Sequence, residues 1–378
     1  MCRTQGFFLI ALLAAAGLAT GCGEDGAGDG ASFSVRADRL HEPTVAKGTK
    51  SIAVTGNRDG KQFVVRDGAR VGEEYDHVSR PKFSPDQSSL AFVAASGNKW
   101  FIVKDGARTK GEYDGIGRMA FSPDGRSLAF NAWSGSEWFI VKDGARASRP
   151  YEEAGAPVFS PDGRSLAFSA STGGKWFAIL DGARVGEEYD WAGQPVFSPD
   201  GRSLAFIARS GDKWFIVKDG AVSGNEYETA SMGEVRRPVF SPDGRSLAHG
   251  VRMDDKCFVV KDGVRVGGEY PDIGEPVFSP DGRSLVFAAI VGHQWSLIRD
   301  GAPTGAGYDA ISSPVFSSDG RRLAFWGRSQ GRWSFIKDGL RVGRAYDAVS
   351  AIEPDAERGR FVSTGIRGKA VYPVEIPW

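Results

Sequence analysis

A unit of 38 residues is repeated along most of this 378-residue chain. The segment Phe121–Phe130, FSPDGRSLAF, returns at Phe159–Phe168 and at Phe197–Phe206. Its first phenylalanine occurs at Phe83, Phe121, Phe159, Phe197, Phe240, Phe278 and Phe316. The steps are 38 residues except for one of 43, between Phe197 and Phe240. A fixed period of this size predicts a row of similar supersecondary units.

The unit that spans residues 119–156 predicts four short β-strands. Alternation around Leu128 and Phe130 has the period of a strand, and no segment has helical spacing. Pro123-Asp124-Gly125 and Asp143-Gly144 are turn sequences, because Pro presets φ and Asp-Gly favours the tight turn of a hairpin. The expected strands are Met119–Ser122, Ser127–Ala132, Trp138–Lys142 and, more polar and weaker, Ala145–Tyr151. Four antiparallel strands in about 40 residues indicate one blade of a β-propeller.

The repeated residues resemble the WD-like blades of TolB-type propellers, in which an aromatic residue and SPDG precede an (I/L)-A-F strand. The resemblance covers about nine tenths of the chain and implies an all-β fold. It says little about biochemical function, because repeat scaffolds carry function in their variable loops. The dipeptide that gives WD-repeat proteins their name is absent, and Lys-Asp-Gly stands in its place.

Counting the units predicts a single β-propeller over residues 31–378. Eight full repeats of four-stranded antiparallel blades lie between residues 43 and 351, and a ninth, degenerate unit follows. Residues 31–38 align with the fourth-strand segment Ala69–Asp76. We therefore expect a ninth hybrid blade that both termini build, which leaves no open sheet edge. The alternative is eight blades with an accessory tail.

The first residues indicate a lipoprotein signal peptide over residues 1–21. Arg3 precedes the apolar stretch FFLIALLAAA, which is too short to span a membrane. Ala19-Thr20-Gly21-Cys22 resembles the lipobox of bacterial lipoproteins, although Leu is usual where Ala19 stands. The resemblance implies lipidation at Cys22 and a bacterial cell-envelope protein. Gly23 in place of Asp implies the outer membrane, facing the periplasm or the cell surface.

Residues 22–30 form a flexible linker in this interpretation, because they contain no large apolar side chain. Cys2 leaves with the signal and Cys22 is acylated, so Cys257 remains alone and we expect it to be a small buried hydrophobe. Loss of Arg3 from the 47 basic residues leaves 46, against 47 acidic residues. This balance gives no argument for nucleic acid as a partner.

Carboxylates recur at the end of each fourth strand, after the tyrosine. They are Asp76, Asp114, Glu152, Asp190, Glu228, Asp309 and Asp347. Such acids could hold a cation, or they could cap loops and persist because the unit was duplicated; we favour caps. The sequence predicts no metal site and no cofactor.

Function is expected where the units differ from one another. The turns after SPDG and at Lys-Asp-Gly are nearly uniform, whereas the Tyr-Asp loops vary and one contains a five-residue insertion. Arg209 and Arg252 stand where another unit has Trp133. Exposed aromatic residues and arginines in variable loops suit a protein contact. The predicted partner-binding residues are His77, Trp133, Trp191, Met232, Arg236, Arg237 and Glu275.

No motif for catalysis stands out. The four histidines are His41, His77, His249 and His293, and His249 takes the place of a core phenylalanine, Phe206. The sequence therefore predicts a non-catalytic, monomeric scaffold that binds another extracytoplasmic protein or peptide and meets the membrane through its lipid anchor. The alternative is a propeller enzyme or a carbohydrate-binding protein that uses polar residues around the central channel.

Overall fold

The computed structural model describes residues 39–40, 44–45, 51–228, 235–368 and 370–378. These residues form strands and turns, and none of them is in a helix. Accordingly, no helix in the described ranges is long and apolar enough to cross a membrane. The chain forms two compact units, Met1–Pro150 and Tyr151–Trp378, and each is described in turn.

The described part of the first unit contains three antiparallel sheets, numbered 1 to 3 in chain order. Sheet 1 consists of β1 (Arg39–Leu40), β2 (Thr44–Val45), β3 (Ile52–Arg58), β4 (Lys61–Arg66) and β5 (Ala69–Tyr75). Sheet 2 consists of β6 (His77–Val78), β7 (Lys82–Phe83), β8 (Leu90–Ser96), β9 (Lys99–Lys104) and β10 (Ala107–Arg108). Sheet 3 consists of β11 (Gly115–Phe121), β12 (Leu128–Ser134), β13 (Glu137–Lys142) and β14 (Ala145–Arg146).

The described part of the second unit contains sheets 4 to 9. Sheet 4 consists of β15 (Glu153–Ala154), β16 (Val158–Phe159), β17 (Leu166–Thr172), β18 (Lys175–Leu180) and β19 (Ala183–Tyr189). Sheet 5 consists of β20 (Trp191–Ala192), β21 (Val196–Phe197), β22 (Leu204–Ser210), β23 (Lys213–Lys218) and β24 (Ala221–Glu228). Sheet 6 consists of β25 (Val239–Phe240), β26 (Leu247–Met253), β27 (Lys256–Lys261) and β28 (Val264–Tyr270).

Sheets 7 to 9 complete the second unit. Sheet 7 consists of β29 (Val277–Phe278), β30 (Leu285–Val291), β31 (Gln294–Arg299) and β32 (Ala302–Tyr308). Sheet 8 consists of β33 (Ala310–Ile311), β34 (Val315–Phe316), β35 (Leu323–Ser329), β36 (Arg332–Lys337) and β37 (Leu340–Tyr346). Sheet 9 consists of β38 (Ala348–Val349), β39 (Glu353–Asp355), β40 (Arg360–Arg367) and β41 (Ala370–Pro377).

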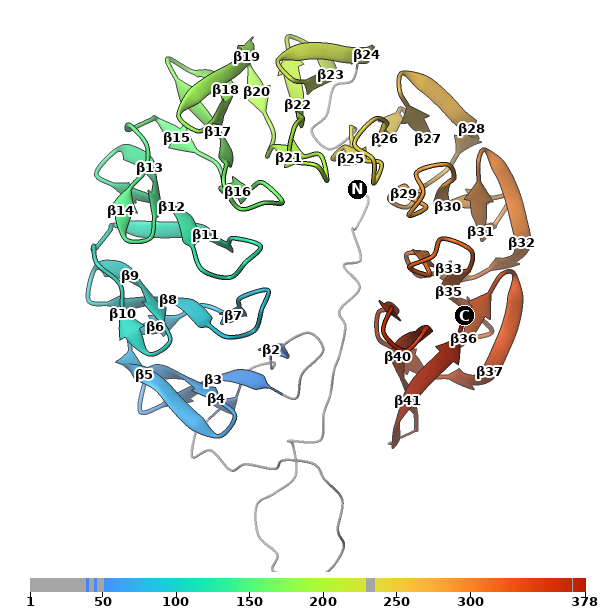
Figure 1. The fold of residues 1–378 in the computed structure, drawn as a ribbon, viewed down its shortest axis with the longest axis horizontal. Helices are drawn as coiled ribbons and strands as arrows, with labels where there is room; N and C mark the ends of the chain where they lie inside the picture. Colours follow the sequence, from blue (N-terminus) through green and yellow to red (C-terminus); the bar gives the residue numbers. More distant parts are fainter. Residues whose placement is uncertain (1–38, 41–43, 46–50, 229–234, 369) are drawn as a thin grey trace, which may run out of the picture. The chain divides into compact units, whose positions relative to one another are not determined.

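Each sheet is an up-and-down meander whose strands pair in chain order. In sheet 5, for example, the order is β20-β22-β23-β24, and β21 continues β20 along the same edge of β22. Within the second unit, Figure 1 shows first strands such as β16, β21 and β29 on the inner side, and fourth strands such as β19, β28 and β32 on the outer side. These four-stranded antiparallel sheets confirm the predicted all-β propeller architecture.

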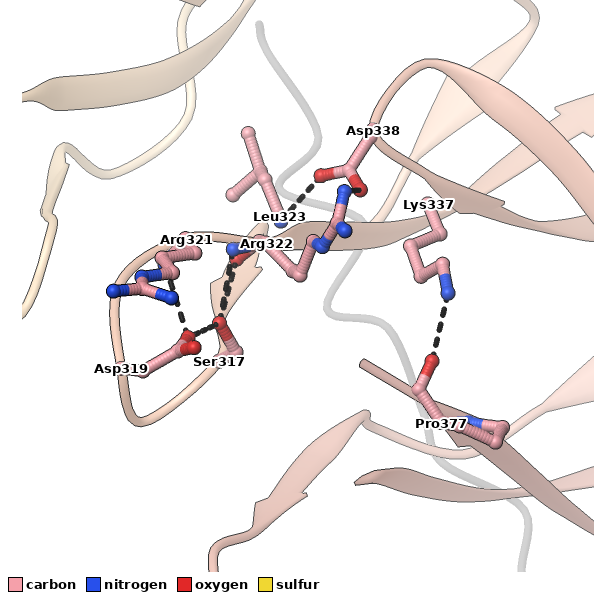
Figure 2. A network of polar contacts seen from close by, with 8 residues as sticks. All are labelled: Ser317, Asp319, Arg321, Arg322, Leu323, Lys337, Asp338 and Pro377. Atoms are coloured by element: carbon pink, nitrogen blue, oxygen red, sulfur yellow. Dashed lines mark hydrogen bonds and ion pairs between the residues drawn. The ribbon is translucent and has the colours of Figure 1, made fainter. Parts of the chain in front are cut away.

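The SPDG segment folds into a turn that its own side chains hold. In sheet 8 the segment reads Ser-Ser-Asp-Gly, and Ser317 Oγ donates a hydrogen bond to Asp319 Oδ1 at 2.5 Å (Figure 2). The N–H of Arg321 donates to the same carboxylate at 3.0 Å. These bonds, that of the Ser317 hydroxyl first, lower the pKa of the Asp319 carboxyl. The turn is thus built locally, which explains why its sequence recurs so uniformly.

The Lys-Asp-Gly turn is joined to the start of the second strand. Asp338 has a φ of 50° and Gly339 a φ of 82°, the left-handed conformation that a two-residue hairpin turn requires. Asp338 Oδ1 accepts a hydrogen bond from the Leu323 N–H at 3.0 Å, and its Oδ2 accepts one from Arg322 at 3.1 Å (Figure 2). In the other full repeats the equivalent aspartate accepts the same backbone hydrogen bond through Oδ1, as Asp181 does from the Leu166 N–H at 2.8 Å.

The hydrophobic core lies between consecutive sheets. Tyr189 at the end of β19 packs against Phe206 and Phe215 of the next sheet, with ring centroids 5.9 and 5.7 Å away. The same contact recurs from sheet to sheet within each unit, for example from Tyr308 to Phe325 at 5.6 Å. Because the middle strands are covered on both faces, they read as nearly continuous apolar runs such as LAF.

His249 replaces the phenylalanine of this contact in sheet 6. Its side chain is buried, as predicted, and its Nε2 lies 3.1 Å from the Tyr227 hydroxyl. Its buried Nδ1 has no hydrogen-bond partner among the described residues. Burial lowers the pKa of His249 to about 4 and raises the pKa of Tyr227 to about 12.

One predicted strand is shorter than expected, and one predicted strand lies outside the described residues. The expected fourth strand Ala145–Tyr151 is only Ala145–Arg146 long, because the Ile140 N–H donates to the Ser148 side chain at 2.9 Å, and not to a strand partner. Sheet 9 has the predicted three strands, its first being split into β38 and β39. The segment 31–38, expected to supply its fourth strand, lies outside the described residues.

We predict that His249 makes the protein acid-sensitive. Its folded pKa of about 4 lies below the unfolded value of 6.5, so the unfolded state takes up a proton as the pH falls. The free energy of unfolding is therefore unaffected by His249 above pH 6.5. It falls progressively as the pH drops toward 4, by an amount on the order of 3 kcal/mol. Denaturant unfolding of wild type and His249→Phe, from pH 7.5 to 4, should show a steeper loss for wild type.

The matched control for this prediction is His293→Gln, because His293 is exposed at the turn that joins β30 and β31. It should leave the pH dependence unchanged. Equal pH slopes for wild type and His249→Phe would show that acid unfolding arises elsewhere.

Candidate functional site

The sheets present two different sides. On one, which we call the SPDG side, the SPDG and Lys-Asp-Gly turns lie together, as the bonds from Asp338 to Arg322 and Leu323 show. On the other, the loop side, the Tyr-Asp corner meets the turn between the second and third strands of the next sheet. There the Asp190 N–H donates to the Arg209 carbonyl at 2.8 Å. Within each unit, the turns thus fall into these two groups.

The repeated carboxylates of the loop side cap turns. Asp190 Oδ1 accepts a hydrogen bond from Lys175 Nζ at 2.6 Å, and its Oδ2 accepts one from the Gly211 N–H at 2.7 Å. These contacts, that of Lys175 first, lower the pKa of the Asp190 carboxyl. Turn N–H groups are capped in the same way by Asp76, Asp114, Glu152, Asp309 and Asp347. Among the described residues, no group of acids, histidines or cysteines could hold a metal ion.

In the first unit, the predicted residues His77 and Trp133 each lie against a tryptophan of the third strand. The ring of His77, an exposed residue of β6, lies 5.3 Å from that of Trp100. The indole of Trp133 in β12 lies 4.5 Å from that of Trp138. It also covers Gly115, where a Cβ atom would come within 1.8 Å of the indole. Both residues are therefore parts of aromatic pairs at sheet ends.

In the second unit, Trp191 is one of three side chains that stand side by side across sheet 5. Trp191 of β20 pairs with Arg209 of β22, and Arg209 pairs with Trp214 of β23. The indoles of Trp191 and Trp214 are 5.4 Å apart, and the Arg209 guanidinium carbon is 5.6 Å from the Trp214 ring. Trp191 is half-buried and Trp214 is buried. We call these three residues the Trp–Arg–Trp corner.

Two predicted arginines connect the neighbouring sheets of the same unit. Arg236 donates to the Ile273 carbonyl at 2.6 Å and pairs with Asp272 at 3.0 Å. The exposed Arg237 donates to the Pro195 carbonyl at 3.5 Å. The structure thus connects these residues to sheets 5 and 7, while the guanidinium of Arg236 is largely committed to its neighbours.

The remaining predicted residues have different outcomes. Glu275 is exposed, two residues beyond Ile273. Met232 and the lipidation candidate Cys22 lie outside the described residues. Cys257 is buried, as predicted, and it occupies in sheet 6 the position that Trp214 has in sheet 5.

The sequence interpretation missed that Arg209 belongs with Trp191. It noted Arg209 as a departure from the repeat but did not place it between two tryptophans. Hairpin register contains this information, because counting back from the turn at Gly211-Asp212 pairs Arg209 with Trp214. The partnership with Trp191 depends on where the broken first strand resumes pairing, and this is a tertiary feature.

An open apolar depression of about 520 Å³ lies in the second unit. It is lined by Pro242, Val277, Phe278, Pro280, Pro314, Val315 and Phe316. All of these residues belong to the repeated pattern of sheets 6 to 8, and none is a predicted binding residue. The depression is therefore a product of the repeat.

Comparison with known proteins finds structures of similar fold. No family model and no curated protein sequence matches the chain. A crystal structure of a eukaryotic initiation factor is 13% identical, covers 83% of this chain and 90% of that chain, and has a TM-score of 0.52. TolB from Acinetobacter baumannii is 22% identical over 54% of this chain, with a TM-score of 0.35. The match spans 58% of that TolB chain.

A third similar structure is the Dos1 propeller, 11% identical over 79% of this chain and 92% of that chain, with a TM-score of 0.43. At these identities, likeness concerns the fold alone. Together with the meander sheets and the inter-sheet tyrosine contacts, it establishes the class: this chain is a β-propeller protein. The propeller fold that the sequence resemblance implied is thus confirmed.

The third-strand tryptophans are buried to different extents. Trp214 is only 2% exposed, whereas Trp176 is half-buried at the edge of the core between sheets 4 and 5. We predict that Trp214→Ala lowers the free energy of unfolding by about 3–5 kcal/mol. Trp176→Ala should cost about 1–2 kcal/mol, because less apolar area leaves water. Denaturant unfolding of both variants tests this order, and equal losses would contradict it.

Proposed function

We propose that this protein is a lipid-anchored, extracytoplasmic scaffold of the bacterial cell envelope that binds another protein or a peptide and performs no chemistry itself. The observation that carries the proposal is that non-repeated side chains follow the fourth strands of consecutive sheets in the second unit. Trp191, Arg237 and Glu275 each stand between a fourth strand and the next paired inner strand, β21, β25 or β29. Aromatic residues and arginines commonly supply binding energy at protein interfaces.

The contrast between the two sides supports this assignment. SPDG-side turns need their Ser, Asp and Gly to form at all, so their uniformity has a structural cause. On the loop side, the capping carboxylate and the preceding tyrosine have such roles. The half-buried Trp191 is not part of that repeated pattern, and it is a large aromatic surface that folding leaves partly accessible.

The partner is best sought by in-cell crosslinking and pull-down of the tagged, full-length protein. With a partner in hand, we predict that Trp191→Ala and Arg237→Ala together weaken binding by at least ~2 kcal/mol. Arg245→Ala and Arg283→Ala, on the SPDG side, are the matched controls and should have no effect. Arg236→Ala belongs in the set only with a stability measurement, because its contacts with Asp272 and Ile273 are structural.

Weakened binding in the Arg245 and Arg283 variants alone, with the fold intact, would assign the interface to the opposite side. The monomeric state that we expect for the scaffold can be measured on the same preparations by sedimentation. A stable dimer would contradict that part of the proposal.

The anchor rests on the sequence around Cys22. Cells fed a labelled fatty acid should incorporate it into the wild-type protein but not into Cys22→Ala. The variant should also leave the membrane fraction, because the acyl chains supply the apolar area that holds the protein there. Unlabelled wild type, or a Cys22→Ala protein that partitions unchanged, would refute lipidation at this residue.

A further inference from the structure

The Trp–Arg–Trp corner has an arrangement that the repeat does not require. Strands two apart in a sheet are separated by about 9.5 Å, yet the centroids of the Trp191 and Trp214 indoles are 5.4 Å apart. Both indoles therefore lean across β22, where Arg209 stands between them. Other units have Trp133, Ser171 or Ile290 at the position of Arg209, so the fold does not need an arginine there.

Arg209 has a buried donor that the protein leaves unused. Its Nε is buried and makes no hydrogen bond with any described residue. Asp190, the nearby carboxylate, already binds Lys175 and the Gly211 N–H. A buried, unpaired donor normally lowers the stability of a protein, so its presence needs an explanation.

The equivalent arginine of the next sheet shows how such a donor is satisfied internally. Arg252 donates from Nε to Cys257 Sγ at 3.4 Å, and from Nη2 to the Pro271 carbonyl at 3.4 Å. In sheet 5 the position of Cys257 is filled by Trp214, whose indole ring offers no such acceptor. The unused donor of Arg209 is therefore a consequence of the tryptophan beside it.

We propose that the Trp–Arg–Trp corner is a carboxylate-binding site. The Nε–H and one Nη–H of a guanidinium form a parallel pair of donors that matches the two oxygens of a carboxylate. Walls of indole exclude water and strengthen such a charge-assisted bond. Trp191 is the half-buried member of the pair, and in this proposal the carboxylate reaches Arg209 by displacing its ring.

The inference deepens the proposed function and rests on it: the carboxylate is supplied by the bound protein or peptide, either from an acidic side chain or from its C-terminus. The site itself can be tested without the partner. The full-length protein in detergent, labelled with ¹⁵N-arginine and fluorotryptophan, reports on the Arg209 Nε–H and on both indoles. Signals are assigned by their loss in Arg209→Lys, Trp191→Phe and Trp214→Phe.

Three small probes separate the sources of the carboxylate. Acetyl-Gly-Glu-NH2 has a side-chain carboxylate, acetyl-Gly-Gly-OH has a C-terminal one, and acetyl-Gly-Gln-NH2 is the neutral control. We expect saturable downfield shifts of the Arg209 Nε–H, with shifts of both indoles, for at least one carboxylate probe and none for the neutral one. Arg209→Gln should weaken that binding by at least about tenfold.

Arg328→Gln is the matched control, because Arg328 has the same place in sheet 8 but pairs with Ala310 and Trp333, not with two tryptophans. It should leave probe binding unchanged. The site is refuted if neither carboxylate binds saturably, if the neutral probe or inorganic phosphate binds equally well, or if Arg209→Gln binds as wild type does. It is also refuted if the Arg209 Nε–H signal is already that of a strongly bonded group before any addition.

Binding of the natural partner tests the loop-side interface and the carboxylate site separately. Loss of binding in Trp191→Ala but not in Arg209→Gln would leave the loop-side interface in place and overturn the carboxylate site. Loss of binding in neither variant, with both folded as judged by thermal unfolding, would overturn the interface as well. Loss in both, with Arg328→Gln unaffected, supports both.

Discussion

The fold depends on the tyrosine that ends the fourth strand. A single four-stranded sheet of this size cannot cover its own apolar faces, so each sheet needs a neighbouring sheet. Tyr189 supplies the link by packing onto Phe206 and Phe215 of the following sheet. The next residue, Asp190, caps that sheet's second turn through the Gly211 N–H. The Tyr-Asp dipeptide thus joins consecutive sheets twice, once by apolar packing and once by a hydrogen bond.

Because the sheets are joined in this way, the two sides of the sheets tolerate substitution to different extents. The SPDG side is made of turns whose side chains bond to their own backbone, as Ser317 and Asp319 do, so substitution there breaks the turn. On the loop side the tyrosine and the capping acid have such structural roles, and Trp191 and Arg237, at neighbouring positions, differ from the repeat. Duplicated units can therefore diverge on the loop side at little cost in stability. Trp191 and Arg237 show that they have done so.

Divergence has also reached the core. His249 stands where other units have phenylalanine and keeps a single contact to the Tyr227 hydroxyl. Arg209 stands beside two indoles with a buried donor unused. His249 replaces a core phenylalanine, and Arg209 lacks the internal acceptors that the equivalent Arg252 has. The two residues lie in sheets 5 and 6, on either side of the five-residue insertion. This part of the second unit therefore contains buried polar atoms that lower the stability of the fold, and it is where we propose that a partner binds.

The sequence by itself determined the strand periodicity, the turn types and the propeller class. Each of these follows from local rules: alternation of apolar residues, Asp-Gly at positive φ, and a constant period. It also predicted correctly that His249 and Cys257 are buried, because both stand at a core position of an aligned unit. What only the tertiary structure decided is which side chains meet across strands and sheets. The 5.4 Å approach of Trp191 to Trp214 over Arg209, the pairing of Arg236 with Asp272 and the unequal burial of Trp176 and Trp214 depend on strand register and on packing between sheets. A period along the chain does not contain these distances, because they are set by contacts between residues that the repeat treats as equivalent.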